Sequence, residues 1–456
     1  MRVGVVGAGY VGLVAAAGLA LAGHDTVIAE ADPSRLARLR ERRAPFLEPG
    51  LDEWLRQAGE RLSVVSSVQE MGPTDAIMIA VGTPSGVSGQ GDLTQVRQAI
   101  EEVVRTAAPG TVIIMKSTVP PGTGRDLVRQ YIAPARRGLA YVSNPEFLRE
   151  GRALHDWLHP DRIVIGADED WAAERAAELY RGIEAPVLRT DITSAEMIKY
   201  AANALLATKI SFINEIANLC ELVGAHIDDV ARGVGMDPRL GPHFLQAGIG
   251  YGGSCFPKDT RALYFTAAVN GYAFELLRAV IEVNRRQRIR VVHRLNALLD
   301  GLAGRTVAVL GLAFKPGTDD TRESPGLEIA MTLAGYGARV QVYDPVAVLP
   351  ERGGPPASPV VLSPGLVRVP ALEDAVRSAQ AVVVATEWPE FVEADWQRLY
   401  RLMVAPRVVF DGRNCLDATR LAAMGFRYVG VGRRVEPATG RGDVAPVSLA
   451  DGTGGS

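Results

Sequence analysis

The chain has 456 residues, of which 47% are hydrophobic and 22% charged, and its formal net charge is −3. This length is enough for about three domains with a core each, and the small negative charge offers no basic field to a nucleic-acid backbone, so we expect no nucleic-acid partner. The three cysteines lack metal-ligand spacing, so we predict a cytoplasmic protein with neither a metal site nor a disulfide framework.

A glycine-rich turn stands near the start of the chain. A β-branched run at 2–6 precedes GAGYVG at 7–12, and an Ala/Leu-rich helical pattern follows. Strand, turn and helix in this order predict a dinucleotide site, because the pyrophosphate can rest on the first turn of the helix. The glycines also break up the apolar start, so we expect neither a signal peptide nor a membrane span. The candidate contacts are Gly7, Gly9, Tyr10, Val11 and Gly12.

The choice of dinucleotide is predicted from the end of the second strand-like run. That run, at 26–29, ends at Glu30. A carboxylate here can bond both ribose hydroxyls and would repel a 2′-phosphate, which favours NAD over NADP. Arg35 lies nearby in the sequence and tempers this preference.

Strand-like and helical segments continue to alternate beyond this unit. The strand-like runs are 76–80, 112–115 and 140–143, and helical patterns occur near 93–107 and after Gly122. This alternation predicts a parallel, doubly wound sheet, whose ligands bind at the carboxyl ends of the strands.

Three loops at these strand ends carry polar residues. VGTPSG at 81–86 and KSTVPPGT at 116–123 supply Thr83, Ser117 and Thr118, although turn chemistry accounts for such residues equally well. NPEFLREG at 144–151 places Glu146 and Glu150 four positions apart, on one face if the segment is helical. The alternative for these carboxylates is a solvated, charged turn.

One long helix is predicted from Ser194 to Val223, where neither Pro nor Gly occurs. A helix about 45 Å long can span a whole domain and join two others. We therefore predict that this helix is the central spine of the protein and a dimer surface. Lys199 and Asn203 lie four positions apart on it, and this pair on an apolar helix predicts a polar cavity. A snorkelling lysine is the alternative.

The stretch GIGYGGSCFPKD, residues 248–259, presents Cys255 after four glycines. Pro257 fits the first position of a helix, which would set Cys255 beside the positive end of the helix dipole and Asp259 one turn further. A thiolate would be favoured there. The alternative is a cysteine buried as a small hydrophobic residue.

A second α/β unit opens at Thr306, after a second long helix at 274–299. Its first turn lacks the fingerprint glycines and carries Lys315 and Arg322 instead, so it would hold a charged group by side chains. Strand-like runs at 339–343, 381–385 and 407–410 complete a second sheet, and Arg413 follows the last of them.

The predicted fold class is therefore α/β, with two Rossmann-like, doubly wound parallel-sheet domains joined by a long central helix and a helical middle domain. We expect an NAD-binding domain at 1–193, a helical dimerisation domain at 194–300 and a second Rossmann-like domain at 301–436, which the resemblance described next implies to be UDP-sugar-binding. Residues 437–456 are rich in Gly, Pro, Ala and Asp and predict a disordered tail.

The order and spacing of these motifs, over about residues 1–435, resemble the UDP-glucose 6-dehydrogenases within the nucleotide-sugar dehydrogenase family, which also includes GDP-mannose dehydrogenases. The motifs that carry the resemblance are GAGYVGL, FLEPGL, VGTPSG, KSTVPPGT, NPEFLREG, EMIKYAANA, GIGYGGSCFPKDTRAL and GLAFKPGTDDTRESP.

The resemblance implies a role for each site residue. Cys255 would be the nucleophile, Lys199 and Asn203 would stabilise an oxyanion, Asp259 would assist Cys255 and a water, and Glu146 would be the base that hydrolyses a thioester, with Thr118 beside them. The implied NAD contacts outside the glycine turn are Glu30, Arg35, Thr83, Ser117, Thr118, Glu150, Lys258 and Arg322. The implied contacts of the sugar nucleotide are Glu146, Phe147, Leu148, Arg149, Glu150, Lys199, Asn203, Gln246, Gly248, Tyr251, Gly252, Phe314, Lys315 and Arg413, with Arg239 supplied by a neighbouring subunit.

The same resemblance implies the reaction: NAD-dependent, four-electron oxidation of UDP-glucose to UDP-glucuronate through a thiohemiacetal and a thioester on the cysteine. The product would serve polysaccharide biosynthesis, and the enzyme would be a homodimer. GDP-mannose or a UDP-N-acetylhexosamine is the alternative substrate. The chain departs from the family pattern at Glu30, where Asp is common, and at Pro316, where a basic residue is common.

Two other functions stay open from the residues. A single-step hydroxy-acid dehydrogenase of similar architecture would use Lys199 as base and leave Cys255 incidental. A non-catalytic NAD sensor would need none of Cys255, Lys199, Asn203, Asp259 and Glu146, and their joint presence argues against it.

Overall fold

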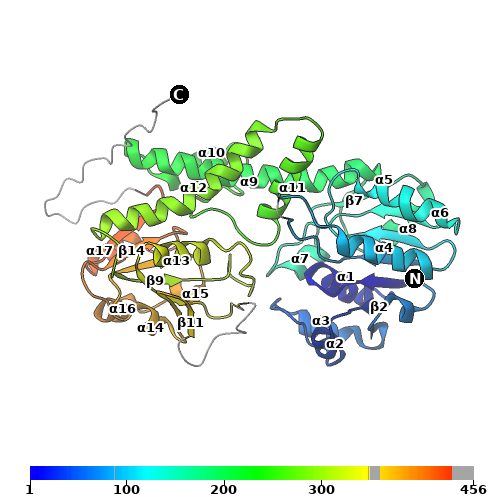
Figure 1. Ribbon diagram of the computed structural model, residues 1–456, viewed down its shortest axis with the longest axis horizontal. Helices are drawn as coiled ribbons and strands as arrows, with labels where there is room; N and C mark the ends of the chain where they lie inside the picture. The colour runs from blue at the N-terminus through cyan, green and yellow to red at the C-terminus, as the bar shows by residue number, and fades with distance from the viewer. Residues whose placement is uncertain (87, 348, 350–359, 434–456) are drawn as a thin grey trace.

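The computed structural model describes residues 1–86, 88–347, 349 and 360–433. Two sheet domains lie side by side, and helix α9 (Ile192–Val223) extends over both (Figure 1). The predicted fold class is confirmed. The tail predicted from residue 437 lies outside the described residues.

The N-terminal domain is built on an eight-stranded sheet of order β3-β2-β1-β4-β5-β6-β7-β8. The first six strands are parallel, whereas β7 pairs antiparallel to β6, which the sequence pattern did not indicate. The strands are β1 (Arg2–Val6), β2 (Asp25–Ala29), β3 (Leu62–Val65), β4 (Ala76–Ile79), β5 (Val112–Met115), β6 (Ala140–Ser143), β7 (Ile163–Ala167) and β8 (Val187–Thr190). The helices are α1 (Tyr10–Leu21), α2 (Pro33–Arg40), α3 (Leu51–Ala58), α4 (Thr94–Thr106), α5 (Thr123–Leu127), α6 (Ala133–Ala135), α7 (Ala153–Leu158) and α8 (Asp170–Glu178).

The C-terminal domain repeats this plan with the order β11-β12-β10-β9-β13-β14-β15. Apart from the antiparallel edge pair β11 and β12, the strands are parallel. The strands are β9 (Thr306–Leu310), β10 (Arg339–Tyr343), β11 (Val360–Ser363), β12 (Leu366–Arg368), β13 (Ala381–Val384), β14 (Val408–Asp411) and β15 (Arg427–Gly430). The helices are α13 (Pro325–Gly335), α14 (Leu372–Val376), α15 (Pro389–Val392), α16 (Trp396–Leu402) and α17 (Ala418–Ala423).

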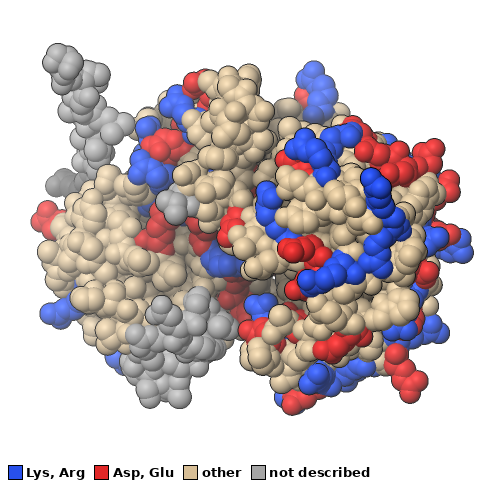
Figure 2. All heavy atoms as spheres, turned by 45° about the vertical axis from the view of Figure 1, so that its right-hand side comes forward, with Lys and Arg blue, Asp and Glu red and all other residues tan. Residues whose placement is uncertain are grey.

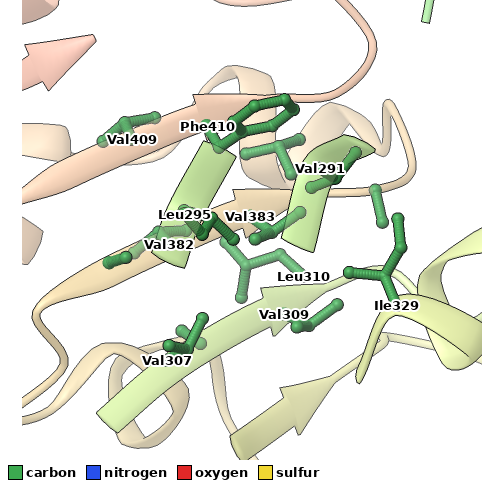
Figure 3. Packing of buried hydrophobic residues seen from close by; sticks show 14 of the residues in the cluster. Val291, Leu295, Val307, Val309, Leu310, Ile329, Val382, Val383, Val409 and Phe410 are labelled. Atoms are coloured by element: carbon green, nitrogen blue, oxygen red, sulfur yellow. The ribbon is translucent and has the colours of Figure 1, made fainter. Parts of the chain in front are cut away.

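The helical middle joins the two sheets through shared cores. Besides α9 it contains α10 (Ile227–Gly235), α11 (Phe256–Val269) and α12 (Glu275–Leu298). Val291 and Leu295 of α12 pack on β9, β13 and β14 (Figure 3), and Ile213 and Ala217 of α9 belong to the same buried cluster. The middle helices therefore share a hydrophobic core with the C-terminal sheet. This shared core fixes the orientation of α9.

The surface is mixed in charge. On the face shown in Figure 2, Lys and Arg side chains alternate with Asp and Glu over the N-terminal domain. Within the described residues, no helix combines the length and apolar character needed to cross a membrane.

The contact between α5 and α9 sets the loop at 116–123 against the spine. Glu196 of α9, 2% exposed, accepts hydrogen bonds from the amides of Gly122 and Gly124 at 2.7 Å each. Burial raises the pKa of Glu196 to about 7, against the effect of those amides. A Cβ on Gly124 would lie 2.5 Å from Ile192 and 2.6 Å from the Tyr141 ring, so only glycine fits.

We expect Gly124→Ala to lower the stability by about 1–3 kcal/mol, because the added methyl overpacks this contact. The matched control is Gly233→Ala in α10, where no atom lies within 4 Å of the Cβ position; the substitution should raise stability by up to about 1 kcal/mol. Thermal denaturation of both variants checks this, and equal midpoints would contradict it.

Candidate active site

Cys255 stands where a glycine-rich loop enters helix α11. It is the N-cap of that helix, and its carbonyl accepts the Asp259 amide at 2.8 Å. Phe256 is the first helical residue and Pro257 the second, one position later than predicted. The thiol is half-buried, and the predicted juxtaposition of Cys255 with a helix start is observed.

The glycines before Cys255 allow close contact with the C-terminal domain. A Cβ on Gly252 would lie 2.3 Å from the carbonyl oxygen of Glu323, and one on Gly253 would lie 2.7 Å from the Phe314 ring. The Gly253 amide donates to the Arg322 carbonyl at 3.1 Å. The loop can therefore lie between the two sheet domains only without side chains at these positions.

The polar face of α9 meets the residues around Cys255. The Lys199 ammonium lies 3.1 Å from Glu146, whose other oxygen accepts the Leu148 amide at 2.5 Å. The Asn203 amide donates to Asp259 at 2.6 Å, and Lys258 pairs with the same carboxylate. Lys199, Asn203, Glu146 and Asp259 are each at most 6% exposed. A buried lysine paired with a carboxylate excludes the snorkelling interpretation.

The thiolate predicted at the start of this helix is not supported. Burial raises the pKa of Cys255 to about 11; Lys199 lowers it, and the carboxylates of Glu146, Asp259 and Glu150 raise it further. Partial burial and the three carboxylates together outweigh the effect of the helix start on the Cys255 sulfur. Cys255 is therefore a thiol at neutral pH, and a nucleophilic role would require it to lose that proton.

Lys199 stays charged in this environment. Burial lowers the pKa of its ammonium, but the carboxylates, Glu146 first and then Asp259, raise it more, so the pKa lies above its ordinary value. A lysine that holds its proton at neutral pH is suited to stabilising negative charge on oxygen rather than to removing a proton.

Glu150 joins the N-terminal domain to the C-terminal one. Its carboxylate accepts from the Ser254 hydroxyl at 2.8 Å and lies 3.7 Å from the Arg322 guanidinium. Burial and Asp320 raise the pKa of Glu150 to about 7. Arg322 is itself held by Asp320 at 2.7 Å, and burial lowers the pKa of neighbouring Lys315. This cluster surrounds Ser254, the residue before the candidate nucleophile.

The fingerprint turn fits a dinucleotide. Gly7 has φ of 95°, and a Cβ on Gly12 would lie 2.0 Å from the Gly7 carbonyl oxygen. At Gly9, by contrast, nothing lies within 4 Å of the Cβ position, and no side chain caps α1, which begins with Tyr10 and Val11. Free amides and open space at one helix start are what a pyrophosphate requires.

The acid expected at the ribose end is in place. Glu30 follows β2 and accepts from the Ala8 amide at 3.1 Å and the Asp32 amide at 2.9 Å, which fixes it beside the turn. Arg35 is exposed in the first turn of α2.

The loops after β4 and β5 are tied to each other. The Thr83 hydroxyl donates to the Thr118 carbonyl at 3.0 Å, and the Ser117 hydroxyl donates to the Val81 carbonyl at 2.7 Å. The hydroxyl groups of Thr83 and Ser117 thus donate to backbone carbonyls, as the turn interpretation predicts. The Thr118 side chain is half-buried.

The residues predicted to contact the sugar nucleotide differ in their burial. Arg413 donates to the carbonyls of Ala385 at 2.7 Å and Phe314 at 3.0 Å, so it locks the C-terminal loops together. A further set of these residues is buried or half-buried: Phe147, Leu148, Gly248, Tyr251, Gly252, Phe314 and Lys315. Arg149, Gln246 and Arg239 are exposed, and Arg239 pairs with Asp237.

Sequence reasoning missed the polar side chains that hold the glycine-rich loop. Asn284 binds the Tyr251 amide at 2.8 Å, and Gln287 donates to the Gly248 carbonyl at 2.8 Å. Arg288 donates to the Tyr251 carbonyl at 2.6 Å and pairs with Glu328. All three belong to the segment NRRQRIR. Their spacing places them on the same face of α12 as the buried Val291, and this spacing could have indicated that they are buried.

The second sheet holds its acid differently. Asp344 follows β10 as Glu30 follows β2, but it accepts the amides of Leu312 at 2.7 Å and Ala313 at 2.9 Å and the Trp388 indole at 3.1 Å. Its carboxylate is used within the turn after β9. Glu30 thus accepts one amide of its glycine turn, whereas Asp344 accepts two amides and an indole of the C-terminal domain.

Comparison with known proteins agrees with this geometry. Models of the UDP-glucose/GDP-mannose dehydrogenase family match residues 1–184 (NAD binding domain), 193–286 (central domain) and 308–418 (UDP binding domain). The chain is 43% identical to UDP-glucose 6-dehydrogenase YwqF of Bacillus subtilis over 440 residues, which cover 95% of this chain and 98% of that protein.

Solved structures give the same family. A UDP-glucose dehydrogenase of Pyrobaculum islandicum is 40% identical with a TM-score of 0.85, over 95% of this chain and 98% of that one. A UDP-D-ManNAc dehydrogenase of Pyrococcus horikoshii is 29% identical with a TM-score of 0.84, over 95% and 99%. The chain therefore belongs to the UDP-glucose/GDP-mannose dehydrogenase family and is an NAD-dependent dehydrogenase.

Proposed function

We propose that the enzyme oxidises UDP-glucose to UDP-glucuronate in two steps, with the half-oxidised sugar held on Cys255. The observation that carries this proposal is the arrangement of Lys199 and Glu146, 3.1 Å apart and buried, around a free thiol. UDP-glucose is favoured because the relatives above 40% identity bear that activity in their names. GDP-mannose or a UDP-N-acetylhexosamine is the alternative, since a relative at 29% identity is a UDP-D-ManNAc dehydrogenase.

NAD, held by the turn at 7–12 and by Glu30, supplies the hydride acceptor when bound. The C6 alcohol would first give a hydride to that acceptor and its hydroxyl proton to solvent, which leaves an aldehyde. The Cys255 sulfur then bonds to C6 and the thiol proton ends on the former carbonyl oxygen, which gives a thiohemiacetal. After exchange for a second oxidised NAD, the thiohemiacetal would give up the second hydride and its hydroxyl proton in the same way, which leaves a thioester.

Water completes the reaction. It attacks the thioester carbonyl, Glu146 accepts its proton, and the carbon–sulfur bond breaks to release the carboxylate and restore the Cys255 thiol. Lys199 and Asn203 donate to the oxygen on which negative charge develops, and removing one such donor typically costs about 10² to 10³ in rate. Asp259 holds Asn203 in position.

The single-step hydroxy-acid dehydrogenase is disfavoured by the charge of Lys199. That reaction needs a neutral lysine as base, whereas the surrounding carboxylates raise the pKa of Lys199. It also leaves unexplained why Cys255 lies among these groups.

We further propose a cytoplasmic homodimer that supplies polysaccharide biosynthesis. Leu205, Phe212 and Leu219 follow one another at seven-residue spacing along α9 and are 64%, 52% and 51% exposed. A stripe of this kind on a surface helix is suited to pairing with a second copy. The exposed Arg239 could then complete the partner's site.

The first test is Cys255→Ser. We expect the wild-type enzyme to form two NADH for each UDP-glucose consumed, and Cys255→Ser to lose at least about 10³ in steady-state rate, since serine is a far weaker nucleophile. Cys415→Ser, at a free cysteine of the C-terminal domain, is the control and should be unchanged. Full turnover by Cys255→Ser, or one NADH for each sugar, would overturn the covalent scheme.

The second test follows the pKa of Cys255. Because that pKa is raised to about 11, only roughly 10⁻⁴ of the sulfur is thiolate at neutral pH. Alkylation of Cys255 by iodoacetamide should therefore be slow and rise about tenfold for each pH unit up to about pH 9. Mass spectrometry of the Cys255 peptide measures this, and fast, pH-independent alkylation near neutrality would contradict it.

The third test addresses the dimer. Phe212→Glu places a charge in the proposed interface and should yield a monomer, as measured by size-exclusion chromatography with light scattering. Met331→Glu, at a residue of α13 that is 58% exposed, is the matched control and should stay dimeric. A wild-type monomer or an unaffected Phe212→Glu dimer would rule the interface out.

A further inference from the structure

The motif FLEPGL has no role in the reaction described so far, yet it contains a buried carboxylate. Glu48 lies in the loop between α2 and α3 and is 6% exposed. It accepts the amide of Gly151 at 2.6 Å and the amide of Ala153 at 2.8 Å, and the Tyr10 hydroxyl donates to it as well. Three donors from two distant segments thus converge on one side chain.

Both segments belong to the active site. Tyr10 is the first residue of α1, in the dinucleotide turn, and Gly151 ends the loop that carries Glu146 and Glu150. The Tyr10 hydroxyl also lies 3.1 Å from the Arg149 carbonyl oxygen. Burial and Glu48 raise the pKa of Tyr10, so its hydroxyl keeps its proton and acts as a donor.

The residues beside Glu48 extend the contact in both directions. The Phe46 ring packs on the Tyr10 ring with centroids 5.3 Å apart. The Leu47 amide donates to Asp319 of the C-terminal domain at 3.3 Å. Residues 46–48 therefore contact the dinucleotide turn and the loop after β9, while Glu48 itself contacts the loop at 144–151.

The far side of that loop is equally close to the C-terminal domain. A Cβ on Gly151 would lie 2.9 Å from the Gly317 carbonyl oxygen, and the Thr318 hydroxyl lies 3.5 Å from Glu150. With one side against Gly317 and the other on Glu48, the loop has little freedom to move while Glu48 is in place.

We propose that Glu48 is a positioning residue for the reaction. Through Tyr10 and the amides of Gly151 and Ala153 it fixes the loop bearing Glu146 and Glu150 relative to the dinucleotide turn. Without it, Glu146 is no longer held at one distance from Cys255, while the backbone amides that meet the pyrophosphate are unchanged. The inference rests on the proposed function, because it assigns Glu146 a part in that chemistry.

The test is Glu48→Gln, which keeps the volume but replaces one acceptor oxygen by a donor, so that at least one of the three partners faces an NH₂ group. We expect kcat/KM for UDP-glucose to fall on the order of 10²-fold, as misplaced catalytic groups typically cause, with KM for NAD within about twofold of wild type. Amide hydrogen exchange in the peptide that contains Gly151 and Ala153 should rise. Glu53→Gln in α3, an exposed carboxylate outside the site, is the control and should leave all three unchanged.

A purely structural role would lower the melting temperature and leave the kinetic constants at assay temperature unaltered. Unchanged kcat/KM for UDP-glucose in folded Glu48→Gln therefore overturns the proposal. If that variant does not fold, Glu48→Asp, which withdraws the carboxylate by one methylene, is measured in the same way with the same criterion. A wild-type enzyme that does not oxidise UDP-glucose refutes the proposed function instead, and exchange at Gly151 and Ala153 still reports whether Glu48 positions the loop.

Discussion

The buried ammonium of Lys199 is the charge around which the site is organised. An isolated ammonium away from water is strongly unfavourable, so its position requires the Glu146 carboxylate at 3.1 Å. That carboxylate is in turn held by the Leu148 amide. Burial raises the pKa of Cys255, and Glu146 is among the carboxylates that raise it further, so the sulfur is protonated at neutral pH. This pairing thus bears on the charge of the proposed oxyanion donor, on the position of the proposed base and on the proton of the proposed nucleophile.

The constraint extends outward through loops that cannot carry side chains. Gly252 and Gly253 touch Glu323 and Phe314, so the segment that ends at Cys255 lies against the C-terminal domain. Polar side chains of α12 bind its backbone, and Arg288 carries the contact on to α13. In the C-terminal domain, the acid after β10 is Asp344, and it binds the amides of Leu312 and Ala313 in the turn after β9. The two sheets therefore share a topology but differ in the contacts of their first turns.

The fold was largely predictable from the sequence, because parallel strands buried on both faces appear as short apolar runs; those at 112–115, 140–143 and 339–343 match the observed strands. The antiparallel direction of β7 was not predictable, since the local residue pattern does not show in which direction a strand runs. Residues with motif spacing, such as Lys199 and Asn203, were found. Asn284, Gln287 and Arg288 were not identified, because charge alone does not show which face of a helix is buried. The prediction of a thiolate was wrong because it considered only the helix start. Burial and carboxylates that are distant in the sequence raise the pKa of Cys255.

The central claim is that the sulfur of Cys255 holds the sugar between its two oxidations. Mass spectrometry of the acid-quenched Glu146→Gln enzyme, after incubation with UDP-glucose and NAD, tests this most directly, because without Glu146 the hydrolysis should be the slow step. The account predicts a covalent adduct with the mass of the sugar nucleotide as its acyl form, on the peptide that contains Cys255. Product formation with no adduct, or an adduct on another residue, would contradict it.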